Sequence, residues 1–164
     1  MKKRKWRWGA LALGALGIAV WVSSLTYPQG RITPVAAQEL PVTAQVIIGG
    51  TTVGLEVAST AEEQMTGLMF RDALPINRGM LFNLPRPQAQ VVWMKEVRFP
   101  IDAVFLKQGR VQLVLSDLPP CRRDPCPVYG ISESVDQVME LNAGQAEQLE
   151  IVPGQYLSIQ TIHP

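Results

Sequence analysis

Four side chains in the middle of the sequence could together bind or transform a ligand. Arg71 ends the apolar run GLMFR, Trp93 and Lys95 stand two residues apart, and Asp102 enters a very apolar segment. An aromatic ring offers a stacking face, the cations would bind an anion or polar oxygens, and the acid would orient them. The sequence therefore suggests a binding cleft around these four residues. In the structural alternative, Asp102 forms an ion pair with Arg71 or Lys95, and Trp93 fills the core.

Carboxylates offer the main route to catalysis. The single histidine is His163 near the C-terminus, so a histidine triad or a histidine metal site is excluded within the domain. No glycine-rich phosphate loop follows a predicted strand. A hydrolase or lyase would instead use Asp102 and Glu140, with Lys95 as electrostatic support. Glu140 is also a candidate binding residue beside the four named above, and its structural interpretation is a carboxylate that anchors the turn after it. We expect no metal and no cofactor.

Cys121 and Cys126 are separated by four residues in the segment PPCRRDPCP. In an oxidising compartment such a pair can close a small disulfide loop. Zinc would need two further ligands, and a redox-active pair usually has Cys-x-x-Cys spacing. We predict a structural disulfide, with free thiols as the alternative.

Residues 1–37 have the pattern of a membrane-targeting segment. A basic cluster precedes an apolar run over residues 9–25, and small residues stand before Gln38. This order predicts a secretory signal peptide, cleaved before Gln38. The run could also remain as an N-terminal membrane anchor, because aromatic residues flank it and its length approaches that of a bilayer span. Both alternatives keep Met1 cytoplasmic and export the body to the periplasm or the cell exterior. The basic cluster consists of Lys2, Lys3, Arg4, Lys5 and Arg7.

The body of the protein is acidic. From Gln38 onward nine Lys and Arg residues stand against fourteen Asp and Glu residues, a net charge of −5. An acidic body is a poor electrostatic match for a phosphate backbone. We therefore expect no nucleic acid partner, and contact with a membrane through the N-terminal segment only.

Residues 38–41 are predicted to be a linker, and residues 42–164 a single β-rich domain. Gly49-Gly50 between two alternating segments predicts a hairpin of strands 42–48 and 52–58. The capping-box spacing of Thr60 and Glu63 predicts a short helix over 61–68, whose Met65, Leu68 and Met69 would be core contacts. Further strands are predicted over 79–83, 90–95, 101–107, 110–116, 135–141 and 155–162, with a long loop over 118–130.

Seven or eight short strands with one or two short helices predict a mostly β fold. A compact β-sandwich or a partly open barrel are the architectures that such a pattern favours.

Six motifs stand in this order along the body: QMTGLMFR at 64–71, GMLF at 79–82, WMK at 93–95, PID at 100–102, the two Pro-Cys pairs within 120–127, and ELNAG at 140–144. Together they resemble the domain of unknown function 192 family, also called uncharacterised protein family 0127, from about Val53 to Leu157. The resemblance implies a compact β-rich fold of jelly-roll type, commonly behind a signal peptide or membrane segment in bacteria and archaea, and it brings no established activity.

One position departs from this family pattern. After the WMK motif the family usually has a polar amide, whereas here Glu96 follows. If that position belongs to a ligand site, its chemistry in this chain is changed.

The leading functional hypothesis is a non-enzymatic binding or accessory domain that works outside the cytoplasm. Its ligand would be a cell-envelope saccharide or a short peptide, because an aromatic platform beside charged groups suits either one. The alternatives are a carboxylate-dependent envelope hydrolase or lyase, and a purely structural partner of a larger assembly.

Overall fold

The computed structural model describes residues 36–162. The basic cluster and the apolar run over 9–25, on which the predictions of a signal peptide or an anchor depend, lie outside the described residues. Neither of the two helices within 36–162 is long and apolar enough to cross a membrane.

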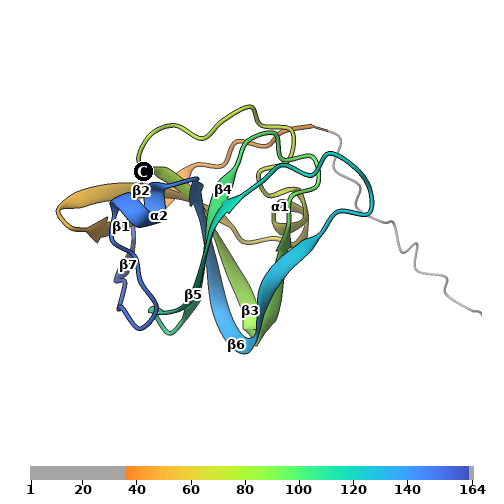
Figure 1. The fold of residues 1–164 in the computed structure, drawn as a ribbon. Coiled ribbons are helices and arrows are strands. Elements are labelled where there is room, and N and C mark those ends of the chain that lie inside the picture. The colour runs from red at the N-terminus through yellow and green to blue at the C-terminus, as the bar shows by residue number, and fades with distance from the viewer. Residues whose placement is uncertain (1–35, 163–164) are drawn as a thin grey trace, which may run out of the picture. The chain divides into compact units, whose positions relative to one another are not determined.

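Within residues 36–162, seven strands form one sheet in the order β5-β4-β6-β3-β2-β1-β7, which is not closed into a barrel. Neighbouring strands are antiparallel except β2 and β3, which are parallel. The prediction of a compact, mostly β fold with two short helices is confirmed (Figure 1). The elements are β1 Val42–Ile48, β2 Thr51–Ala58, α1 Ala61–Thr66, β3 Arg78–Trp93, β4 Ile101–Lys107, β5 Arg110–Leu118, β6 Val128–Asn142, α2 Gln145–Gln148 and β7 Ile159–Thr161.

Local sequence signals determine the short connections. Gly49 and Gly50 both have positive φ, at 57° and 81°, as the tight turn between β1 and β2 requires. The capping box is present, because the Thr60 side chain accepts from the Glu63 N–H while the Glu63 carboxylate accepts from the Thr60 N–H. Helix α1 is two residues shorter than predicted, since Gly67 adopts a φ of 46° that ends it.

Four of the predicted strand segments have the wrong length. The segments predicted over 79–83 and 90–95 form one strand, β3, and β6 begins at Val128 rather than at Val135. Irregularities in the β3–β6 register between Asn83 and Gln90 let the long pair bend while its pairing continues. Figure 1 shows both strands turning sharply near their middle. The last strand is also shorter than predicted, because β7 covers only Ile159–Thr161 rather than 155–162.

The centre of the sheet is buried on both faces. Along β4 every residue from Ile101 to Leu106 is buried, and alternate residues enter different cores: Val104 and Leu106 one, Ala103 and Phe105 the other. We name these the first core, which contains Leu141, and the second core, which contains Val138. A strand buried on both faces has a mostly apolar sequence, and in β4 the four residues from Ala103 to Leu106 are all apolar while Asp102 is the buried exception.

The predicted disulfide is present. Cys121 and Cys126 are bonded, with their Cα atoms 5.6 Å apart. The Cys121 N–H donates to the Met94 carbonyl at 3.2 Å, so the loop that follows β5 lies beside the end of β3. Asp124 lies within 4.8 Å of both sulfurs, but the sulfurs are joined to each other and the group offers a metal only one carboxylate.

Candidate functional site

A cavity of about 450 Å³ lies between α1 and the bent pair of β3 and β6. Its walls are mostly apolar side chains and backbone, with a few polar groups, which is the usual composition of a small-molecule or peptide site. We call it the α1–β3 pocket. Met65, Val91, Trp93 and Val128 are exposed at its margin. The lining residues are Ala61, Gln64, Met65, Thr66, Gly67, Leu68, Met69, Phe82, Leu84, Gln90, Val91, Val92, Trp93, Val97, Val128, Val138 and Glu140.

Among residues 36–162, Glu140 is the one ionisable side chain in this lining. In the β3–β6 register it is opposite Met80, and in the β4–β6 register it is opposite Ala103, both fully buried. Burial raises the pKa of its carboxyl to about 8, and no ion pair or hydrogen bond within residues 36–162 offsets that effect. At neutral pH the pocket therefore contains a protonated carboxyl that can both donate and accept a hydrogen bond.

Glu140 should make the folded protein less stable as pH rises. Its pKa is raised on folding, so between its unfolded value of 4.5 and about 8 the native state binds the extra proton and the free energy of unfolding falls. Relative to Glu140→Gln, we expect wild type to lose about 2–4 kcal/mol between pH ~5 and pH ~9, less than a fully dry carboxyl would lose because the pocket admits water. Urea unfolding of both proteins across that range measures the difference. Parallel pH profiles would contradict the expected titration, and Glu133→Gln, on an exposed part of β6, serves as the control.

Trp93 and Lys95 lie together at the pocket margin. The Trp93 side chain is 43% exposed, so it does not fill the core. The Lys95 Nζ lies 5.7 Å from the centroid of the Trp93 ring, within the range of a cation–π contact. Lys95 also lies 4.0 Å from the Asp124 carboxylate, and both groups are solvent-exposed, so this ion pair is weak. The margin thus offers an aromatic face and an accessible cation.

Arg71 is held away from the pocket by a buried ion pair. Its guanidinium donates two hydrogen bonds to Glu56 on β2, one of them from Nη1 to Oε1 at 2.9 Å, and both residues are 7% exposed. Burial alone would raise the pKa of Glu56, but the hydrogen bonds from Arg71 and from the Leu40 N–H, with the charge of Arg71, lower it below 4.5 overall. Arg71 therefore joins the chain after α1 to the sheet.

Asp102 is fully buried on the other face of the sheet. It pairs with Leu141 of β6, whereas Glu140 pairs with Ala103, so the two carboxylates point to opposite faces. One Asp102 oxygen accepts from the Asp117 N–H at 2.9 Å, and the other accepts from the Ala146 N–H at 2.8 Å. Asp102 thus satisfies backbone donors at an irregularity in β5 and in the first turn of α2, which has no side-chain cap of its own.

The structure brings together only part of the cleft predicted from the sequence. Trp93 and Glu140 line the α1–β3 pocket and Lys95 lies at its margin, while Arg71 and Asp102 make closed structural contacts. The ion pair expected between Asp102 and Arg71 or Lys95 is wrong, because Glu56 is the partner of Arg71. An acid in the otherwise apolar segment VGLEVA was the available signal for Glu56.

The contribution of α1 to the pocket was also missed. Met65, interpreted as a core contact, is 43% exposed and lines the cavity with Leu68 and Met69. Glu96, where the family usually has an amide, has a φ of 56°. Asparagine adopts this left-handed conformation more readily than other side chains, so the backbone gives a reason for an amide there.

Comparisons with known proteins agree with the fold. A crystal structure from Sinorhizobium meliloti 1021, provisionally described as a transcription regulator, is 25% identical, covers 77% of this chain and 97% of its own, and has a TM-score of 0.64. A protein of unknown function from Novosphingobium aromaticivorans is 26% identical, covers 77% and 95% of the two chains, and has a TM-score of 0.62. No curated protein matches the sequence.

The family assignment rests on a match that spans most of the chain. Residues 44–159 match the family model DUF192, described as an uncharacterized ACR. These residues include all six motifs on which the resemblance was based. The chain therefore belongs to the DUF192 family.

Proposed function

We propose that this chain is a non-enzymatic binding domain that works outside the cytoplasm and holds an apolar group of a peptide in the α1–β3 pocket. The observation that carries the proposal is the pocket itself: an apolar cavity of about 450 Å³ with a single buried carboxyl, Glu140, and an exposed aromatic ring, Trp93, at its margin. Apolar walls supply most of the affinity in such a site, and a few polar groups orient the ligand.

A peptide fits this lining better than a saccharide does. A sugar carries a hydroxyl on most of its carbons, and each one needs a partner when it leaves water. In the described part of the chain, the polar side chains of the lining are only Gln64, Thr66, Gln90 and Glu140, and Gln64 already donates to two backbone carbonyls. An aliphatic or aromatic peptide side chain needs no such partners, and one peptide N–H could donate to the Glu140 carboxyl.

The geometry does not support a carboxylate-pair hydrolase or lyase. Such an enzyme needs two carboxylates flanking the same bond, whereas Asp102 and Glu140 point to opposite faces of the sheet. Action outside the cytoplasm is supported by the Cys121–Cys126 disulfide and by the order of basic cluster and apolar run in the first 37 residues. The acidic balance of the body is a poor match for nucleic acid, so it gives no support for transferring the description as a transcription regulator from the Sinorhizobium protein to this chain.

Fluorescence of Trp93 tests the proposal. The full-length chain is titrated with tripeptides and tetrapeptides rich in Leu, Phe or Val, and with a panel of cell-envelope saccharides. We expect the apolar peptides to change the emission of Trp93 with saturation, because their side chains exclude water from the pocket margin. Trp93→Phe supplies the blank for the other three tryptophans of the chain.

Variants of Glu140 show whether the response comes from the pocket. Glu140→Leu should lower the affinity for the apolar peptides by about tenfold, because it removes one buried polar contact. Glu133→Leu on the same strand should leave the affinity unchanged. A response to saccharides alone, or no response in either panel, would overturn the proposal.

A further inference from the structure

One stretch of β3 has a strand neighbour on only one side. Strands β2 and β3 pair from Gly54 opposite Arg78 to Ala58 opposite Phe82, where β2 ends. Beyond Phe82, β3 continues to Trp93 with β6 as its only neighbouring strand in the described part of the chain. Beyond Phe82, the edge of β3 that was paired with β2 faces α1 across the α1–β3 pocket. The positions of α1 and β3 in Figure 1 agree with this arrangement.

The first part of this edge is protected and the last part is not. Residues 84–89 carry Pro85, Arg86 and Pro87, and prolines and charges are the usual means by which sheet edges avoid pairing with another chain. Gln64 on α1 further covers the edge by donating to the Asn83 carbonyl at 2.7 Å. Residues 90–93 (QVVW) contain no proline and no charge. The open edge is therefore short and apolar, and it lies in the wall of the pocket.

The backbone groups that this edge offers can be identified. In an antiparallel pair, the N–H and C=O of successive residues point alternately toward and away from the partner strand. The Gln90 carbonyl faces Gly130 of β6 so closely that a Cβ on that glycine would lie 2.2 Å from it. Val91 and Trp93 must then direct their N–H and C=O groups away from β6. Among residues 36–162, only the Gln90 side-chain amide reaches one of these groups, the Val91 carbonyl at 3.1 Å.

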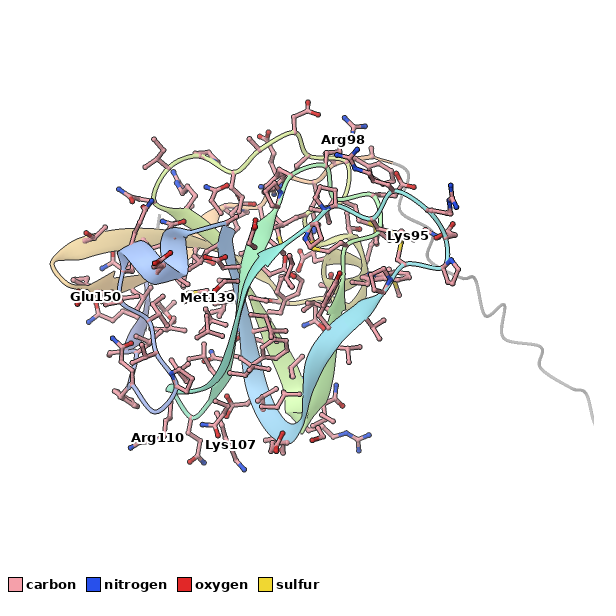
Figure 2. The ribbon with its side chains drawn as sticks, viewed as in Figure 1. Lys95, Arg98, Lys107, Arg110, Met139 and Glu150 are labelled. Atoms are coloured by element: carbon pink, nitrogen blue, oxygen red, sulfur yellow. A yellow bond between two sulfur atoms is a disulfide. The ribbon has the colours of Figure 1, made fainter. Side chains whose placement is uncertain are left out.

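A group of cations lies at the Trp93 end of the edge. Lys95 lies two residues after Trp93, and Arg122 and Arg123 lie in the disulfide loop, which is hydrogen-bonded to Met94. Asp124 of the same loop lies 4.0 Å from Lys95 and offsets one of these three charges. These three are a third of the cations in a body whose net charge is −5. Figure 2 shows Lys95 far from Lys107 and Arg110, at another end of the domain. An anionic group on a ligand would therefore be favoured at the Trp93 end.

We propose that the partner is an extended polypeptide segment that adds a strand to β3 at Val91 and Trp93, with an apolar side chain in the α1–β3 pocket and a carboxylate near Lys95. This inference rests on the proposed function and specifies its mode of binding. The open edge supplies backbone donors and acceptors, which only another backbone in extended form matches in register. The pocket then favours an apolar side chain of the peptide, and the cations favour a negatively charged group on it.

The test begins with a display library of random heptapeptides with free C-termini, selected on the full-length chain. The best binders are resynthesised with a single N-methyl group at each amide in turn. In an added strand every second N–H points to β3, so methylation at alternate amides should weaken binding about tenfold, while the intervening amides tolerate it. Residue-resolved hydrogen exchange should show new protection of the Val91 and Trp93 amides on binding, and no change at Val92, which already faces β6.

Two variants of Val91 form a matched pair for the same edge. Val91→Pro removes one outward N–H without breaking the β3–β6 ladder, and should weaken the selected peptides about tenfold. Val91→Ala keeps the N–H and should cost less. Amidation of the peptide C-terminus should weaken binding to wild type but not to Lys95→Gln.

Each outcome bears on a specific claim. If N-methylation has no alternating effect, or if no heptapeptide is selected while the apolar peptides still change Trp93 emission, strand addition is overturned and the proposed pocket function stands. If neither selection nor fluorescence detects a peptide, strand addition and the proposed pocket function are both overturned. Equal binding of amidated and free peptides overturns the assignment of a carboxylate near Lys95.

Discussion

Replacing Arg71 with methionine should lower the free energy of unfolding by about 3–5 kcal/mol, because the substitution leaves the Glu56 carboxylate buried without its partner. The expected loss is much larger than that of a surface ion pair. Urea unfolding at neutral pH measures it. The double variant Arg71→Met, Glu56→Leu should recover much of the stability, because it also removes the buried Glu56 carboxylate that the single variant leaves without a partner.

The chain contains a matched control for this prediction. Arg98 donates to Asp72 at 2.9 Å, but both side chains are exposed, at 55% and 87%. Arg98→Met should therefore cost less than about 1 kcal/mol. Equal losses in the two variants would mean that burial does not set the contribution of the Arg71–Glu56 pair.

The same pair should have a characteristic pH dependence. The pKa of Glu56 is lowered on folding, so its contribution to stability is present above the unfolded value of 4.5 and is lost as pH falls through the folded pKa. The stability difference between wild type and Arg71→Met should accordingly shrink below pH ~4. This direction is opposite to that expected for Glu140, whose contribution to the free energy of unfolding falls as pH rises.

Replacing Asp102 with alanine should also cost about 3–5 kcal/mol, because it leaves the N–H groups of Asp117 and Ala146 without their acceptor. Asp102→Asn should cost less, since its amide oxygen can still serve one of the two donors. Asp136→Ala is the control: that carboxylate accepts from one exposed N–H, of Gln108, and its loss should cost about 1 kcal/mol.

Asp102 variants also separate stability from binding. Because the side chain lies on the face of the sheet opposite the α1–β3 pocket, peptide-induced changes in Trp93 emission should be unchanged in Asp102→Asn at temperatures where it is folded. A change in affinity without a change in stability would place Asp102 in the binding site, as the sequence alone had suggested.

Signals that act over a few residues were read correctly from the sequence. The Gly49-Gly50 turn, the Thr60–Glu63 capping box and the Cys121–Cys126 disulfide join groups close together in the chain. Such interactions depend on the local backbone conformation, which residues close together in the chain determine. The bend of β3 and β6 was not predicted: separate strands were expected over 79–83 and 90–95, whereas the sheet accommodates an irregular register between them and β3 continues through it.

The family, the mostly β class and most strand positions follow from the amino-acid sequence alone, because motifs, apolar alternation and turn residues are local properties. Which of the candidate residues share a site follows from the folded arrangement of the strands. Asp102 and Glu140 come from strands that meet only in the sheet, and a shift of one residue in their register would have placed them on the same face. That register depends on packing in two cores, and it leaves Glu140 in the pocket that Trp93 also lines, while Asp102 accepts a hydrogen bond from α2.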